Sequence, residues 1–250
     1  MSPPTQVDSR PAGPQPRADR RTRVGVRRLS VAEFLVALVL LIVAAPFLQS
    51  VPNGRLIEAV LLTLALVSAV LAVGARRRTL ALAVILVLPV LLGKWANHFR
   101  PDLVPPALFL VAGLLFVAFV TVQLIRFVLR APRVTTEALY AGIAGYLMMG
   151  LLWVMAYLLV AQADPDAFVF TVGPENLRTM NGFNALYFSF VTLSTVGYGG
   201  IVPVASVARM LAMMEATSGL LYTAVLIARL VALHTMERPA TGAEEQRKSD

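Results

Sequence analysis

The stretch Thr195-Val196-Gly197-Tyr198-Gly199 decides the fold of this chain. A short amphipathic segment, residues 184–194, precedes it and a long apolar segment follows it. This order predicts a short helix, a narrow extended loop and a membrane-spanning helix. Successive backbone carbonyls can point one way only with torsions that glycine adopts freely, which accounts for Gly197 and Gly199. Carbonyls arranged in this way, contributed by several chains, replace the water shell of a cation.

The longer segment ALYFSFVTLSTVGYG, residues 185–199, resembles the pore helix and selectivity filter of potassium channels of the bacterial type. The resemblance covers about residues 136–234. It includes Pro203 after the filter, Arg209 early in the next helix, and Gly219, where the family often has a hinge glycine. It implies K⁺ sites formed by a run of filter residues, Thr195, Val196, Gly197 and Tyr198. One such loop cannot encircle an ion, so a working pore requires a homotetramer.

The resemblance also assigns supporting roles around the filter. Thr195 adds a hydroxyl ligand at the inner end, and Tyr198 braces the loop from behind. The carbonyl end of the pore helix points toward the central cavity, where its partial negative charge stabilises a cation. The residues expected to support the filter from the pore helix are Tyr187, Phe188, Thr192 and Ser194.

Two positions depart from the family pattern. Gly200 stands where potassium channels usually have aspartate, and Val191 stands where some members have an acidic residue. In members that have it, the aspartate ties the outer filter to aromatic residues of the pore helix, here Tyr187 and Phe188. Gly200 has no side chain to accept a hydrogen bond. We therefore expect an outer mouth that is held less rigidly than usual.

Composition places the whole chain in a membrane. Hydrophobic residues make up 58% of it and charged residues only 14%, whereas soluble domains carry roughly a quarter charged residues. The net charge of +8 is distributed between apolar segments rather than on one face, so it indicates topology and not nucleic-acid binding. The absence of cysteine excludes disulfides and thiolate chemistry.

Six apolar segments are candidates to cross a hydrocarbon core of about 30 Å. Basic residues at 76–78 and 126–133 fall on the same side as a basic N-terminal arm when all six cross. Cytoplasmic loops carry an excess of Lys and Arg, so we expect six crossings with both termini in the cytoplasm. The third segment is the shortest and the least secure crossing. The segments are approximately 31–48, 57–75, 80–93, 106–125, 136–161 and 204–233.

These features predict an all-α integral membrane protein with a re-entrant pore helix and filter loop between the fifth and sixth helices. Residues 1–29 are expected to be a disordered basic cytoplasmic arm, and residues 30–130 a four-helix transmembrane region. Residues 131–234 form the predicted pore domain, and residues 235–250 a short polar cytoplasmic tail. The first four helices are interpreted as a packing shell, and a role as the sensor of some stimulus besides voltage is left open.

A voltage sensor is excluded by the sequence of the fourth segment. Voltage gating needs several arginines at three-residue spacing, because each charge yields only about 2.3 kcal/mol per 100 mV. Residues 106–125 contain no basic residue. The gating stimulus is therefore left open.

Acidic residues offer two further interpretations. Asp164, Asp166 and Glu175 give the loop before the filter a local negative charge, which either concentrates cations at the external mouth or belongs to an ordinary solvated loop. Glu215 is the only acid inside the last segment. It must face protein or water, either as a structural hydrogen-bond partner of a neighbouring helix or as a buried anchor or protonation site behind the filter.

The function indicated is passive, potassium-selective conduction across the cell membrane, with K⁺ as the permeant ion and no cofactor. No catalytic nucleophile with a paired base, metal-ligand cluster or phosphate-binding loop appears, so an enzyme is not expected. A weakly selective cation channel remains open because of Gly200. A non-conducting scaffold or receptor and a secondary potassium transporter also remain open. The transporter is disfavoured because the chain holds one pore loop and no inverted repeats.

Overall fold

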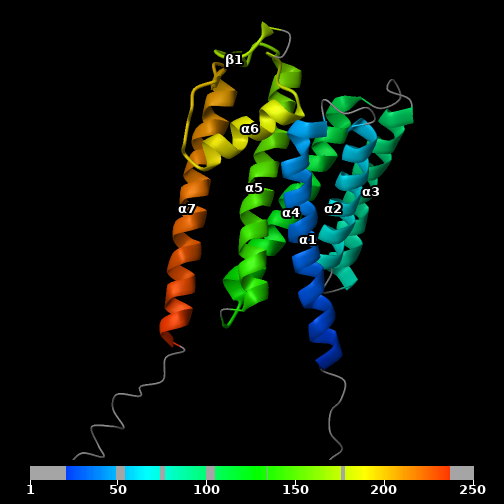
Figure 1. Ribbon diagram of the computed structural model, residues 1–250, viewed down its shortest axis with the longest axis vertical. Coiled ribbons are helices and arrows are strands. Elements are labelled where there is room, and N and C mark those ends of the chain that lie inside the picture. The colour runs from blue at the N-terminus through cyan, green and yellow to red at the C-terminus, as the bar shows by residue number, and fades with distance from the viewer. Residues whose placement is uncertain are drawn as a thin grey trace, which may run out of the picture.

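The computed structural model describes residues 21–48, 54–73, 77–99, 105–133, 135–175 and 178–236. This part of the chain is mostly helical, with two short strands (Figure 1). In chain order the elements are α1 (Arg21–Leu48), α2 (Gly54–Val73), α3 (Arg77–Phe99), α4 (Pro106–Arg130), α5 (Thr136–Ala163), β1 (Phe168–Phe170), α6 (Gly182–Leu193), β2 (Ile201–Pro203) and α7 (Ser206–Met236).

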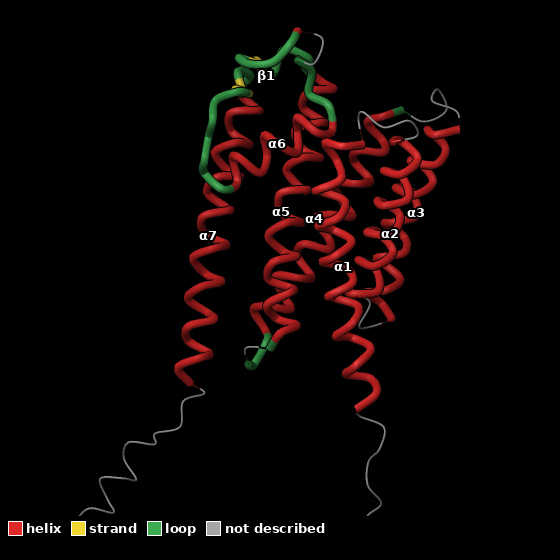
Figure 2. Tube along the Cα trace, in the orientation of Figure 1, coloured by secondary structure: helices red, strands yellow, loops and turns green. Residues whose placement is uncertain are grey.

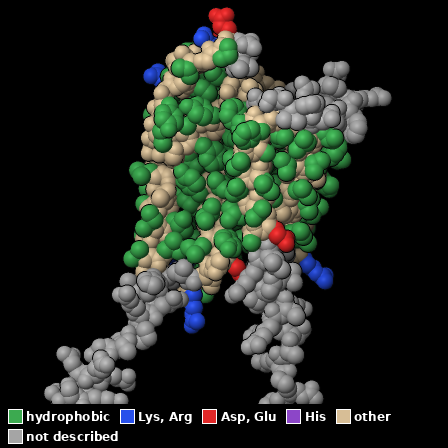
Figure 3. All heavy atoms as spheres, viewed as in Figure 1, with side chains coloured by type: hydrophobic (Ala, Val, Ile, Leu, Met, Phe, Trp, Pro, Cys, Tyr) green, Lys and Arg blue, Asp and Glu red, His purple; other side chains and the backbone are tan. Residues whose placement is uncertain are grey.

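Within the described residues, five helices are long and apolar enough to cross a membrane, and they belong to α1, α3, α4, α5 and α7. The apolar stretch of α2, Leu56–Ala72, is shorter. Apolar side chains cover the middle of the molecule, whereas charged ones lie near its two ends (Figure 3). This distribution is that of a multi-pass membrane protein.

The prediction that the third segment is the weakest crossing was wrong. Helix α3 provides a candidate span over Arg77–Ala96. The apolar pattern placed its ends at residues 80 and 93, but the helix continues through flanking polar residues, because Arg and Lys are good helix formers. Their long side chains can also reach the interface from within the helix.

The helix ends differ from the predicted boundaries elsewhere too. Helix α1 begins at Arg21, so the last part of the arm predicted for residues 1–29 is helical, and residues 1–20 lie outside the described part. Helix α4 continues to Arg130 and α5 to Ala163. The predicted tail lies outside the described residues from position 237 onward.

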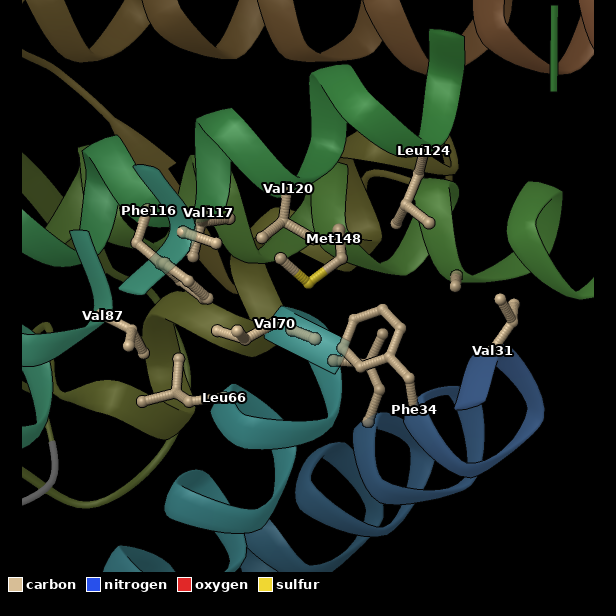
Figure 4. Packing of buried hydrophobic residues seen from close by; sticks show 14 of the residues in the cluster. Val31, Phe34, Leu66, Val70, Val87, Phe116, Val117, Val120, Leu124 and Met148 are labelled. Carbon is tan, nitrogen blue, oxygen red and sulfur yellow. The ribbon is translucent and has the colours of Figure 1, made fainter. Parts of the chain in front are cut away.

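Helices α1 to α4 form a bundle on one side of α5, which we call the peripheral bundle, and α7 lies on the other side of α5 (Figure 1). Helices α1 and α4 contact α5 directly, whereas α2 and α3 pack behind them. Their shared core is apolar: Phe34 and Phe116 are almost fully buried, and Met148 reaches into the same cluster from α5 (Figure 4). Burial of apolar side chains therefore holds the bundle against α5.

Helix α7 is held to its neighbours by polar contacts near its C-terminal half. The hydroxyl of Tyr222 donates to the carbonyl of Gly142 on α5 across 2.6 Å. Arg229 donates from Nε to the carbonyl of Val128 (3.0 Å) and from Nη2 to that of Ala131 (2.8 Å). These carbonyls lie at the end of α4, where helix carbonyls lack partners within the helix. Arg229 thus links α7 to the peripheral bundle.

The two strands join the segment before α6 to the segment after it. They pair antiparallel, with Phe168 opposite Pro203 and Phe170 opposite Ile201. Apart from the short connection between α4 and α5, the loops drawn in Figure 2 gather at this end of the molecule. The strand pair thus closes the chain around α6 and the loop that follows it.

Candidate functional site: the loop after helix α6

Helix α6 is fixed at both ends by side-chain hydrogen bonds. Asn181 caps its start, because its side-chain oxygen accepts from the backbone N–H of Asn184 at 2.9 Å. Ser194 follows its last turn and donates from Oγ to the carbonyl of Phe190 at 2.6 Å. The helix begins two residues earlier than the amphipathic pattern predicted, since glycine at 182 is compatible with a first helical turn.

The loop of residues 195–199 turns its N–H groups back toward α6. The N–H of Thr195 donates to the carbonyl of Thr192, and the N–H groups of Val196 and Gly197 both donate to the carbonyl of Val191, at 2.9, 2.9 and 3.3 Å. Among the described residues, none donates a hydrogen bond to the carbonyls of residues 195 to 198. These carbonyl oxygens are therefore available to an ion.

The backbone of this loop alternates in handedness. Thr195, Gly197 and Gly199 have φ of 59°, 61° and 77°, while the residues between them have negative φ. Thr195 is the only non-glycine residue with positive φ in the described part of the chain. A left-handed conformation costs a non-glycine residue about 1–2 kcal/mol, so the surrounding contacts must hold Thr195 there.

Gly197 and Gly199 are required for their backbone conformation, and not because a side chain at these positions would clash with neighbouring atoms of the chain. A Cβ atom added at Gly197 or Gly199 would meet nothing within 4 Å. Positive φ is nevertheless strained for any residue with a side chain. The sequence predicted glycine torsions at 197 and 199, and the structure has positive φ at both, whereas the positive φ of Thr195 was not predicted.

One face of the loop is uncovered in a single chain. The side chain of Val196 is 51% exposed and that of Tyr198 is 75% exposed. Figure 1 shows the loop after α6 beside α7, on the side away from α2 and α3. No element of the described chain therefore covers this face.

The outer end of the loop is held by Thr171, which the sequence did not identify. Its Oγ1 donates to the carbonyl of Gly199 at 2.8 Å, and its N–H donates to the carbonyl of Gly200 at 3.0 Å. These contacts extend the β1–β2 pairing by one step. The sequence predicted a less rigidly held outer mouth because Gly200 has no acceptor side chain. It did not identify Thr171 as a partner, because the pairing of β1 with β2 leaves no signal in residues 195–199.

The two aromatic residues predicted to support the loop differ in burial. Phe188 is buried and packs edge-to-face on Tyr157, with ring centroids 4.8 Å apart. Tyr187 is 37% exposed, and its hydroxyl lies 4.0 Å from the position of a Cβ built on Gly200. An acidic side chain at 200 would therefore have a hydroxyl partner within reach.

Glu215 of α7 is fully buried and contacts two other helices. The hydroxyl of Tyr157 on α5 donates to Glu215 Oε2. Ser189 Oγ on α6 lies 2.5 Å from Glu215 Oε1 and 2.8 Å from the carbonyl oxygen of Gly150. Glu215 therefore joins α5, α6 and α7 behind the loop. Sequence reasoning missed Ser189 and Tyr157, although each is a polar residue in an otherwise apolar helix.

Gly219 permits α7 to approach the end of α6. A Cβ at this position would lie 2.3 Å from the carbonyl oxygen of Leu193 and 2.9 Å from its side chain. Gly150 on α5 plays a similar part, since a Cβ there would lie 2.7 Å from the ring of Phe190. The structure thus adds a packing role for Gly219 to the hinge suggested by the resemblance.

The acidic residues before α6 are exposed at the same end of the molecule. Asp164, Asp166 and Glu175 are all exposed, and Asp164 accepts a hydrogen bond from the N–H of Asp166 at 3.2 Å. Arg178 donates from Nε to the carbonyl of Gly173 at 3.0 Å. The negative side chains remain available to solvent near the loop of residues 195–199.

Comparisons with known proteins cover the part of the chain that contains this loop. A family model described as "Ion channel" matches residues 146–235, from the middle of α5 to the end of α7. Protein LctB of Bacillus caldotenax is 34% identical over 102 residues, which are 40% of this chain and 74% of LctB. No solved structure matches.

Proposed function

Because the chain belongs to the ion channel family, we propose that it is a potassium-selective channel conducting K⁺ passively through a pore formed by four copies. One observation carries this proposal. The N–H groups of Thr195, Val196 and Gly197 bond back to α6, which leaves the carbonyls of residues 195 to 198 without partners from the described chain. Rings of such carbonyls can replace the hydration shell of K⁺. We call residues 195–199 the filter and α6 the pore helix from here on.

The uncovered face of the filter supports assembly into a tetramer. Val196 and Tyr198 are largely exposed in one chain, although both are large and apolar in character. Helix α7 is likewise little covered, with only 11% of its apolar stretch within Ser206–Ala232 buried. Neighbouring copies arranged around a fourfold axis would cover these surfaces and complete the carbonyl rings.

The peripheral bundle acts in this proposal as a packing shell and not as a voltage sensor. The first basic residues of α4 are Arg126 and Arg130, at its end. We therefore expect voltage alone to change the open probability only weakly. A conductance–voltage curve whose steepness corresponds to several elementary gating charges would contradict this assignment, provided that the filter itself supplies no gating charge.

We further propose six crossings, with α2 as the sixth, and cytoplasmic termini. Helix α2 has 20 residues, so its length of about 30 Å matches the hydrocarbon core. The acidic loop then lies outside the cell. Because the chain contains no cysteine, single cysteines at Asp166 and in the tail can be labelled from one side. An impermeant thiol reagent added to intact cells should label the first and spare the second.

Flux through purified protein in liposomes tests the central proposal. We expect K⁺ to permeate well and Na⁺ poorly, as measured by reversal potentials in mixed solutions. Gly197→Ala replaces a positive-φ glycine at a position where a Cβ meets nothing within 4 Å in one chain, and we expect the strained backbone to abolish selective flux. Equal K⁺ and Na⁺ permeability in the wild type would favour a weakly selective channel, and absence of any current would favour a scaffold or receptor.

A further inference from the structure

A large apolar cavity lies between the peripheral bundle, α5 and the start of the pore helix. Its volume is about 970 Å³, and its walls come from α1, α2, α3, α4, α5 and α6. Phe34, Leu66 and Met148 line its inner part, and all three belong to the buried cluster drawn in Figure 4. Phe183 and Leu186 contribute to it from the pore helix. The cavity therefore lies against the element that precedes the filter.

The charged part of this cavity is one ion pair. Lys94 Nζ lies 2.8 Å from Glu58 Oε1, and both side chains line the cavity. Glu58 is near the start of α2 and Lys94 near the end of α3, which places the pair at the end of the bundle where the pore helix begins. Both side chains are partly exposed, at 24% for Lys94 and 47% for Glu58. Their free hydrogen-bonding positions remain accessible to a ligand.

We propose that this cavity binds a zwitterionic membrane phospholipid, with an acyl chain among the apolar walls and the headgroup at the Lys94–Glu58 pair. An apolar cavity of this size would not be filled favourably by water, whereas an acyl chain matches its walls. Lys94 offers donors to the phosphate and Glu58 accepts from the amine. Because the pair is neutral in sum, it favours a zwitterionic headgroup over an anionic one.

The occupant would join the peripheral bundle to the pore helix through contacts with Phe183 and Leu186. This gives the bundle a role that its lack of gating charges leaves open. The binding inference itself does not depend on potassium selectivity, since it concerns a surface outside the filter.

Native mass spectrometry of the detergent-purified protein tests this binding. The probes are phosphatidylethanolamine and phosphatidylglycerol with identical acyl chains. We expect about one phosphatidylethanolamine per chain to be retained, roughly tenfold more tightly than phosphatidylglycerol. Ala45→Trp adds bulk to the cavity wall and should abolish retention. Val43→Trp, on the exposed side of the same helix, is the matched control and should leave retention unchanged.

Headgroup variants test the site without added bulk. Lys94→Gln should weaken phosphatidylethanolamine retention roughly tenfold, because a charge-assisted bond to phosphate is lost. Glu58→Gln leaves Lys94 unpaired and should shift the preference toward phosphatidylglycerol. Equal retention of both lipids by the wild type would overturn the proposal, as would equal behaviour of Ala45→Trp and Val43→Trp. Retention of detergent in place of either lipid would also count against it.

Discussion

Ser189 Oγ on the pore helix lies 2.5 Å from Glu215 Oε1 on α7, and both residues are fully buried. The same hydroxyl lies 2.8 Å from the carbonyl oxygen of Gly150. A serine hydroxyl carries one proton, so it can donate to only one of these oxygens. Three hydrogen bonds form at once when Ser189 donates to the carbonyl of Gly150, Tyr157 donates to Glu215 Oε2, and a protonated Glu215 carboxyl donates to Ser189 Oγ.

This count leads to a prediction about Glu215. Glutamine has the shape of a protonated carboxyl group, with one acceptor and one donor toward the same partners, so Glu215→Gln should retain most of the thermal stability of the assembly. Glu215→Leu leaves the hydroxyl of Tyr157 buried without its partner and should cost about 1–3 kcal/mol per chain. Thermal unfolding of the purified protein measures both effects.

The matched control for Glu215 is Met213→Leu, a volume-conserving change at an apolar position of the same helix that is exposed in a single chain. It should unfold like the wild type. If Glu215→Gln proved as unstable as Glu215→Leu, the proton count would be wrong and an ionised carboxylate would fit better.

Substitution of Gly219 tests whether this residue acts as a hinge or as a close packing contact. Alanine in place of a helical glycine normally stabilises a helix by about 1 kcal/mol. At position 219, however, its Cβ would lie 2.3 Å from the carbonyl oxygen of Leu193, so Gly219→Ala should lower the unfolding temperature. Gly182→Ala makes the same substitution where nothing lies within 4 Å and should not. Raised stability with impaired opening in Gly219→Ala would instead indicate a hinge alone.

Thr171 is expected to hold the outer end of the filter. Thr171→Val keeps the backbone bond to Gly200 and removes the Oγ1 bond to the carbonyl of Gly199. A hydrogen bond of this kind contributes about 0.5–1.5 kcal/mol net. We therefore expect currents of the variant to decline faster during sustained opening in liposome-patch recordings. Thr179→Val, at another exposed threonine of the same segment, should behave like the wild type.

The missing acid at Gly200 can be restored. A Cβ at this position lies 4.0 Å from the hydroxyl of Tyr187, so the carboxylate of Gly200→Asp can accept a hydrogen bond from it, once Val172 yields at 3.0 Å. A bond to a charged group is worth about 1.5–3 kcal/mol, which would shift a conducting-to-collapsed equilibrium roughly ten- to a hundredfold. Sustained currents should therefore decline less and depend less on external K⁺.

A double-mutant cycle separates this bond from the added charge. Tyr187→Phe removes the hydroxyl, so the effect of Gly200→Asp should disappear in the Tyr187→Phe background. Recordings at high ionic strength screen the four new charges and leave the bond intact. An effect of Gly200→Asp that survives in Tyr187→Phe but vanishes at high salt would attribute it to surface charge.

The sequence determined the local features of this protein on its own. The sequence predicted that Gly197 and Gly199 adopt torsions that only glycine reaches freely, and both have positive φ, because positive φ is a property of single residues. The apolar segments predicted the long helices, since hydrocarbon requires internally bonded backbone, and five of the six segments lie in helices of the described chain that are long and apolar enough to cross a membrane. The predicted ends of the helices were less accurate, as at Arg21 and Arg130. Polar residues at a membrane interface continue a helix beyond the apolar segment from which its ends were predicted.

Only the tertiary structure decided which residues meet. Thr171 reaches Gly199 through the pairing of two short strands, and Ser189, Tyr157 and Glu215 come together from three helices. Gly219 resembled a hinge in sequence, but its packing against Leu193 depends on how α7 crosses the pore helix. These relationships are set by helix packing and strand register, which depend on contacts between residues far apart in the chain and leave no periodic signal along it.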